Sequence, residues 1–135
     1  MRIFLTGATG YVGSAALDAL VRAGHDVTAI VRNGEKAERV ASRGAKPVIG
    51  DLGDPASYKT AAAGHDGYLH AAYEYSGRGR DVDQSVVETL ASLVRGPRGS
   101  TEAGVGRCLL YTSGIWVLGR TTRPAAEDAP TNPIR

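Results

Sequence analysis

The chain has 135 residues, of which 42% are hydrophobic and 22% are charged, and its formal net charge is +2. This composition excludes a disordered or membrane-embedded chain and indicates one globular domain with one core. No apolar run approaches the about 20 residues that span a bilayer, the N-terminus lacks the apolar segment of a signal peptide, and the arginines are scattered. We therefore expect a cytoplasmic protein with no membrane, nucleic-acid or metal partner.

Strand and helix patterns alternate along the chain. The expected strands are 2–6, 26–31, 46–49, 67–72 and 107–112. The expected helices are 14–23, 34–43, 56–63 and 81–95, of which the last is the most amphipathic. Mostly apolar strands separated by helices predict a doubly wound α/β fold with a parallel sheet. Cys108 lies in the fifth apolar run, which predicts a buried and inert thiol.

Three glycines follow the first strand at intervals of three residues, just before the first helical pattern: Gly7, Gly10 and Gly13. A glycine at the turn accepts a positive φ, one at the crest admits a phosphate to the backbone, and one at the helix start allows close packing. The free N–H groups and the helix dipole then suit a diphosphate. We expect valine at Gly10 or Gly13 to abolish binding while much of the fold remains. The alternative is an ordinary glycine-rich turn.

The stretch TGATGYVG, residues 6–13, resembles the TGxxGxxG signature of the short-chain dehydrogenase/reductase superfamily, in its extended or atypical branch related to sugar-nucleotide epimerases and dehydratases. The resemblance implies a Rossmann-type sheet of strand order 3-2-1-4-5 and an NAD(P)-binding domain over residues 1–135. It also implies a cofactor-binding loop made of Gly7, Thr9, Gly10, Tyr11, Val12 and Gly13. In such sheets the ligand binds at the carboxyl ends of the strands, here between the first and fourth.

The second strand ends at Arg32, where an acid would bind the ribose hydroxyls of NAD and a base the extra phosphate of NADP. A guanidinium can bind phosphate with two parallel hydrogen bonds, and Lys36 follows one turn later, so we expect NADP(H) in preference to NAD(H). The alternative for Arg32 is a solvated surface charge.

The third strand leads into GDLGD, residues 50–54, which resembles the superfamily's GDLxD segment. The resemblance implies that Asp51 accepts a hydrogen bond from the adenine amino group and that Leu52 lies against the ring. Asp51 or Asp54 could instead cap the following helix.

The fourth strand closes with HAA, residues 70–72, and related sequences carry a similar His-x-Ala. Small Ala71 and Ala72 would let the cofactor lie against the backbone, whereas His70 is expected to be a packed strand histidine. Tyr73 could line the nicotinamide or substrate pocket or could pack within its loop.

Ser113, after the fifth strand, keeps the first of two hydroxyl positions found in extended members, whereas Gly114 occupies the second, which usually contacts the substrate. Ser113 is therefore either the candidate catalytic residue or a loop cap.

The resemblance implies general acid–base catalysis by a tyrosine whose pKa is lowered by a lysine four residues further along the chain. Residues 127–133, EDAPTNP, resemble the stretch before that pair, but the chain contains no Tyr-x-x-x-Lys. We therefore expect a fold incomplete at its C-terminus, belonging either to a longer enzyme or to an atypical member.

Two functions follow from this resemblance. The first is an NAD(P)-dependent oxidoreductase or epimerase/dehydratase-like enzyme acting on a small carbonyl or hydroxyl substrate, with this chain binding the cofactor. The second is a non-catalytic NADP-binding sensor or regulatory module. The resemblance also allows a homodimer through helix 81–95, although that helix could pack only on the sheet.

Overall fold

The computed structural model describes residues 1–96, 106–122, 124–126 and 128–132. Five strands form one parallel sheet: β1 (Arg2–Thr6), β2 (Asp26–Val31), β3 (Lys46–Ile49), β4 (Gly67–His70) and β5 (Cys108–Tyr111). The order β3-β2-β1-β4-β5 confirms the predicted topology. Thr6 lies opposite Ile30 on one side and His70 on the other, so the carboxyl ends of the three central strands lie level.

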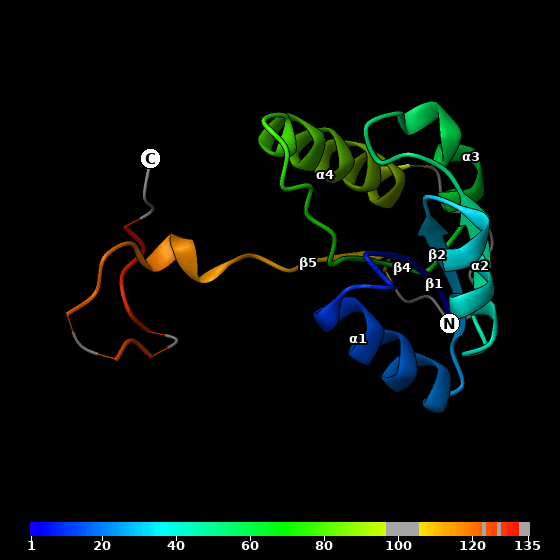
Figure 1. Cartoon of the computed structure of the whole chain (residues 1–135), viewed down its shortest axis with the longest axis horizontal. Coiled ribbons are helices and arrows are strands. Elements are labelled where there is room, and N and C mark those ends of the chain that lie inside the picture. Colours follow the sequence, from blue (N-terminus) through cyan, green and yellow to red (C-terminus); the bar gives the residue numbers. More distant parts are fainter. Residues whose placement is uncertain (97–105, 123, 127, 133–135) are drawn as a thin grey trace.

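Helices cover both faces of the sheet, and Figure 1 shows α1 on the opposite side from α3 and α4. The helices are α1 (Tyr11–Arg22), α2 (Gly34–Ala41), α3 (Lys59–Ala62) and α4 (Gly79–Arg95), with short 3-10 turns η1 (Pro55–Ser57) and η2 (Ile115–Leu118). The predicted helix 56–63 is thus divided, because the backbone at Tyr58 leaves the helical region with φ of −134°.

Two apolar cores lie on the two faces of the sheet, because successive side chains of a strand point to opposite sides. Phe4 belongs to the core under α3 and α4, and Leu5 belongs to the core under α1 and α2. Val82, Val86 and Leu90 of α4 are buried in the first of these cores. The apolar side of α4 therefore packs on the sheet within the chain.

The prediction for Cys108 is wrong, because its side chain is exposed. The run that contains it forms β5, which lies at the edge of the described sheet and pairs only with β4. Leu110 is 65% exposed and Tyr111 is 46% exposed on the same strand. An apolar run in the sequence therefore does not imply buried side chains when the run forms a strand at the edge of the sheet.

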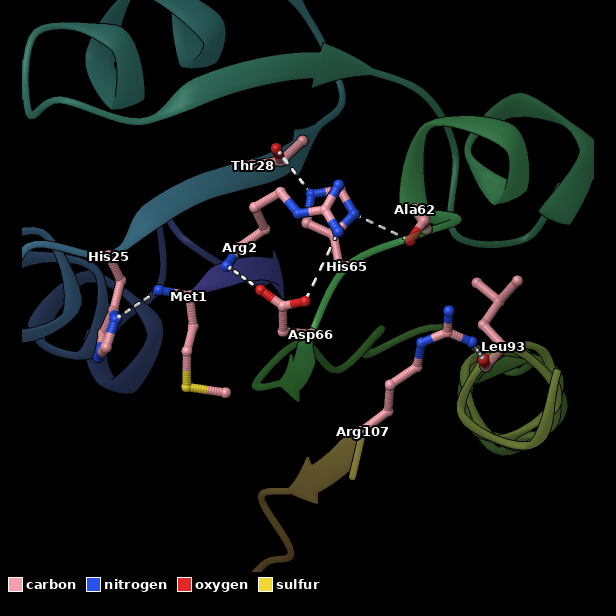
Figure 2. A network of polar contacts seen from close by, with 9 residues as sticks. All are labelled: Met1, Arg2, His25, Thr28, Ala62, His65, Asp66, Leu93 and Arg107. Atoms are coloured by element: carbon pink, nitrogen blue, oxygen red, sulfur yellow. Dashed lines mark hydrogen bonds and ion pairs between the residues drawn. The ribbon is translucent and has the colours of Figure 1, made fainter. Parts of the chain in front are cut away.

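Polar contacts tie together the amino ends of the strands, as Figure 2 shows. The backbone N–H of Arg2 donates to the Asp66 carboxylate over 2.7 Å, and the Arg2 guanidinium lies 3.6 Å from the same side chain. His65 uses both ring nitrogens, at 2.9 Å from the Ala62 carbonyl and 3.0 Å from the Thr28 hydroxyl. These contacts join β1 and β2 to the segment before β4, at the edge opposite the predicted site.

None of the helices in the described ranges is both long and apolar enough to cross a membrane.

Candidate cofactor-binding site

The glycine loop joins β1 to α1 in a compact turn. Gly7 has φ of +77°, and a Cβ at this position would overlap the backbone carbonyl of Ala71 after β4. Its own carbonyl accepts the N–H of Gly10 over 2.9 Å. Gly10 caps α1 with an extended backbone and no side-chain hydrogen bond, so the first turn has no side-chain cap. Such a helix start offers N–H groups to an anion.

Gly10 and Gly13 differ in the space around them. A Cβ at Gly10 would lie 3.3 Å from the Gly7 carbonyl oxygen, whereas a Cβ at Gly13 would overlap that carbonyl. The expectation that valine at Gly13 leaves much of the fold is therefore wrong, because the side chain would push α1 away from the turn. The Cβ of a valine at Gly10 would have one close neighbour among the described residues, so this variant is the better probe of binding.

A hollow of about 190 Å³ lies beside the glycine turn, at the carboxyl ends of β1, β2 and β3; we call it the β2-side hollow. Seven of the predicted cofactor-binding residues line it: Gly7, Thr9, Arg32, Asp51, Leu52, Ala72 and Tyr73. Lys36, Glu74 and Arg78 also contribute to its wall. The structure thus brings residues from four loops to one place.

The two acids after β3 have different surroundings. Asp54 accepts the N–H of Ala56 over 3.1 Å and caps η1, as the capping alternative predicted. Asp51 instead accepts the N–H of Gly53 over 2.8 Å and lies on the wall of the hollow. Leu52 lines the hollow and also packs against the core under α4.

The cations of this hollow make no direct ion pair with a carboxylate of the described residues. Arg32, Lys36 and Arg78 take part in none of the ion pairs formed within the described residues. Sequence reasoning found the first two from their place after β2 but missed Arg78, which belongs to no motif. The only available signal was a basic and glycine-rich run at 77–80 after the tyrosine-rich loop.

A second hollow of about 710 Å³ lies toward β5, and we call it the β5-side hollow. Val12, Ala71 and Ser113 line it together with Asp83 and Tyr111, and Ala72 and Tyr73 line both hollows. The predicted residues Gly10, Tyr11 and Gly13 line neither hollow, and Tyr11 is 97% exposed. Ser113 is also exposed and presents its side chain at the second hollow.

A chain of hydrogen bonds runs from the sheet to the wall of the β5-side hollow. His70 lies between the Thr6 hydroxyl, 2.5 Å from Nδ1, and the Asp83 carboxylate, 3.1 Å from Nε2. The Tyr111 hydroxyl donates to the other carboxylate oxygen of Asp83 over 2.8 Å. His70 is 1% exposed, which confirms a packed strand histidine.

These groups also influence each other's protonation. Burial lowers the pKa of His70, and the Asp83 carboxylate opposes that shift. A neutral ring donates from Nε2 to Asp83 and accepts at Nδ1 from Thr6, because a carboxylate can only accept. Burial, followed by the Asp83 carboxylate, raises the pKa of Tyr111. Sequence reasoning missed Asp83 and Tyr111, which lie far apart in the chain and belong to no motif.

A parallel 3-2-1-4-5 sheet with a glycine turn and two hollows at its carboxyl edge defines a dinucleotide-binding fold. The NAD(P)H-binding family matches residues 7–128 of the chain. The chain belongs to this family, and its relatives confirm the resemblance to epimerase/dehydratase-like short-chain dehydrogenases/reductases.

The chain is similar to longer proteins. An uncharacterised protein of Schizosaccharomyces pombe is 34% identical over 99% of this chain and 45% of its own length. The 4-hydroxy-2-methyl-3-oxo-4-farnesyl-3,4-dihydroquinoline-1-oxide ketoreductase of Stigmatella aurantiaca is 42% identical over 62% of this chain and 25% of its own length.

Among solved structures, the UDP-glucose-4-epimerase of Stenotrophomonas maltophila with bound NAD and formylated UDP-arabinopyranose superposes with a TM-score of 0.73. It is 25% identical and covers 98% of this chain and 43% of its own. The chain thus spans less than half the length of these relatives.

Proposed function

We propose that residues 1–135 are the cofactor-binding part of an NADP(H)-dependent reductase or epimerase/dehydratase-like enzyme that acts on a small carbonyl or hydroxyl compound. The observation that carries the proposal is the β2-side hollow, where Arg32 and Lys36 meet Asp51 beside the glycine turn. Several relatives are named as ketoreductase or reductase, which supports this reaction class.

In this proposal the glycine turn holds the diphosphate and the β2-side hollow holds the adenosine half. Asp51 accepts from the adenine amino group with the carboxylate oxygen that does not bind Gly53, and Leu52 lies against the ring. Arg32 and Lys36 bind the 2′-phosphate, which a guanidinium grips with two parallel hydrogen bonds. Such a contact makes NADP(H) the preferred cofactor over NAD(H).

The β5-side hollow would receive the nicotinamide and the substrate. The bound nicotinamide supplies hydride transfer, and the protein supplies position and hydrogen bonds. Ala71 and Ala72 offer a flat backbone wall, Tyr73 lies between the two hollows, and the exposed Ser113 hydroxyl can donate to a substrate oxygen.

Two further properties belong to this proposal. The single cysteine, Cys108, has an exposed thiol and no disulfide partner in the chain, which fits the reducing cytoplasm. A homodimer through α4 would use the exposed parts of Leu93 and Val94, although both side chains also pack against the core under α3 and α4.

Titration with NADPH, followed by its fluorescence, tests the proposal. Gly10→Val should weaken binding at least about tenfold, because the added side chain occupies the space of the diphosphate. Gly106→Ala is the control, since a Cβ there meets no atom of the described residues within 4 Å. Unchanged affinity in a folded Gly10→Val variant would contradict a diphosphate at this turn.

A further inference from the structure

We propose that Arg78, on the loop between β4 and α4, is a further specificity-determining residue that binds the 2′-phosphate of NADP(H) together with Arg32 and Lys36. The inference rests on the function proposed above. It adds to that function a contact from a second, separate part of the fold, for which the sequence carries no motif.

The three cations reach the hollow from opposite sides of β1. Arg32 and Lys36 follow β2, whereas Arg78 follows β4, and these two strands flank β1 in the sheet. All three nevertheless line the β2-side hollow, whose floor includes Gly7 and Thr9 from the turn after β1. A group bound there is enclosed by positive charge from both sides.

Two acids in the same wall, Asp51 and Glu74, lower the charge of the lining side chains from three positive charges to a net +1, but they bind other partners. Asp51 binds the Gly53 N–H, and Glu74 accepts the Ser76 hydroxyl over 2.5 Å. Neither acid forms an ion pair with the three cations, within the parts of the chain that the structure describes. Three like charges around a hollow of about 190 Å³ repel one another, and an anion between them relieves that repulsion.

The backbone of the loop fixes where Arg78 starts. Its N–H donates to the Ser76 hydroxyl over 3.2 Å, and the N–H of Gly79 donates to the Ser76 carbonyl over 3.0 Å. Gly79 is buried, and a Cβ at this position would overlap the Glu74 carbonyl. The loop therefore holds the backbone of Arg78 in a compact turn, from which its side chain lines the hollow.

The 2′-phosphate fits this position better than the diphosphate does. Gly10 and Gly13, which belong to the proposed diphosphate cradle, do not line the β2-side hollow, whereas Asp51 and Leu52 do. The hollow thus belongs to the adenosine half of the cofactor. The 2′-phosphate is the group on that half that distinguishes NADP from NAD, and it carries a charge of about −1.5 to −2 at neutral pH, as phosphate monoesters do.

The test compares Arg78→Met with Arg80→Met, which removes a similar exposed arginine from α4 outside the hollow. Calorimetric titration of each purified variant with NADPH and with NADH gives the two dissociation constants. Arg78→Met should weaken NADPH about tenfold and NADH less than about twofold, as expected for loss of a charged phosphate contact. Arg80→Met should change neither.

Competition with 2′,5′-ADP and with ADP provides a second readout that needs no nicotinamide. Arg78→Met should weaken only 2′,5′-ADP. Equal losses for NADPH and NADH, or no loss for either, would overturn the role of Arg78 while leaving the proposed function standing. A wild-type chain that binds neither dinucleotide would overturn the proposed function and this inference with it.

Discussion

At the amino ends of β1 to β4, charged side chains meet partners of opposite sign, whereas at the carboxyl ends the cations form no ion pair among the described residues. Arg2 pairs with Asp66, and the Lys46 ammonium lies 2.8 Å from the Asp26 carboxylate. The cations at the other edge that form no ion pair among the described residues are Arg32, Lys36 and Arg78.

The difference indicates what each edge is for. Paired charges at the amino edge hold strands in register and need nothing further. Unpaired cations around a hollow repel one another and are stabilised by an anion from outside the chain. A change at the amino edge should therefore alter stability and leave cofactor affinity alone, whereas a change at the carboxyl edge should alter affinity.

The largest effect is expected at Gly7, where turn and β4 meet. Gly7→Val combines a positive φ with overlap of the Ala71 carbonyl, so we expect a loss of unfolding free energy of at least about 3 kcal/mol. Urea unfolding measures this loss. Gly106→Ala, in open space, is the control. A Gly7→Val chain of near wild-type stability would mean that the turn is not closely packed.

At the carboxyl edge, Arg32→Met should weaken NADPH about tenfold through loss of a charged hydrogen bond to phosphate. NADH affinity and the urea midpoint should stay unchanged, because the exposed Arg32 contributes no ion pair within the described chain. Titration of both dinucleotides measures the effect, and Arg39→Met is the matched control on α2 outside the hollow. Equal losses for both cofactors would assign Arg32 to another contact.

Stability should also fall in mild acid, because burial lowers the pKa of both His65 and His70 in the folded chain. Below about pH 6.5 the unfolded chain binds more protons than the folded chain. The contribution of these histidines to the free energy of unfolding is therefore complete above that pH and declines as the pH falls toward their lowered pKa values in the folded chain.

Urea unfolding at about pH 7.5 and about pH 5.5 measures this decline. His70→Gln should make this decline smaller, because the buried imidazole that titrates differently in the folded chain is removed. A decline that is the same with and without His70 would show that its imidazole does not titrate differently on folding.

The smallest effect is expected for Lys46→Met at the amino edge. The pair with Asp26 is exposed, and solvent screens such pairs, so the urea midpoint should hardly change. NADPH affinity should not change at all. A change in NADPH affinity in this variant would contradict the claim that the amino edge affects only stability.

Much of the fold could be predicted because its signals are local. The glycine turn and the alternation of strands and helices follow from residues close together in the chain, whereas the order of the strands in the sheet was implied by the resemblance to the superfamily. The division of helix 56–63 could not be predicted, because it depends on burying the Tyr58 ring, 1% exposed, under α4. Cys108 was misjudged because burial depends on which strand lies at the edge.

The candidate site divides in the same way. Arg32, Asp51 and Ala72 directly follow strands, so their meeting at one edge could be predicted from the topology. The positions of Arg78 and of the hydrogen-bonded residues His70, Asp83 and Tyr111 depend on how α4 and the loop before it pack on the sheet, which the sequence pattern does not give. The stretch 127–133 includes two residues, 127 and 133, that lie outside the described residues. Its resemblance to the stretch before a Tyr-x-x-x-Lys pair therefore stays a prediction.

The most direct test of the distinction between the two edges is the pair of dissociation constants of the wild-type chain for NADPH and NADH, measured side by side by calorimetry at physiological salt. The account predicts that NADPH binds at least about tenfold more tightly, and that rising salt narrows the difference by screening the unpaired cations. Equal affinities for the two dinucleotides would contradict it.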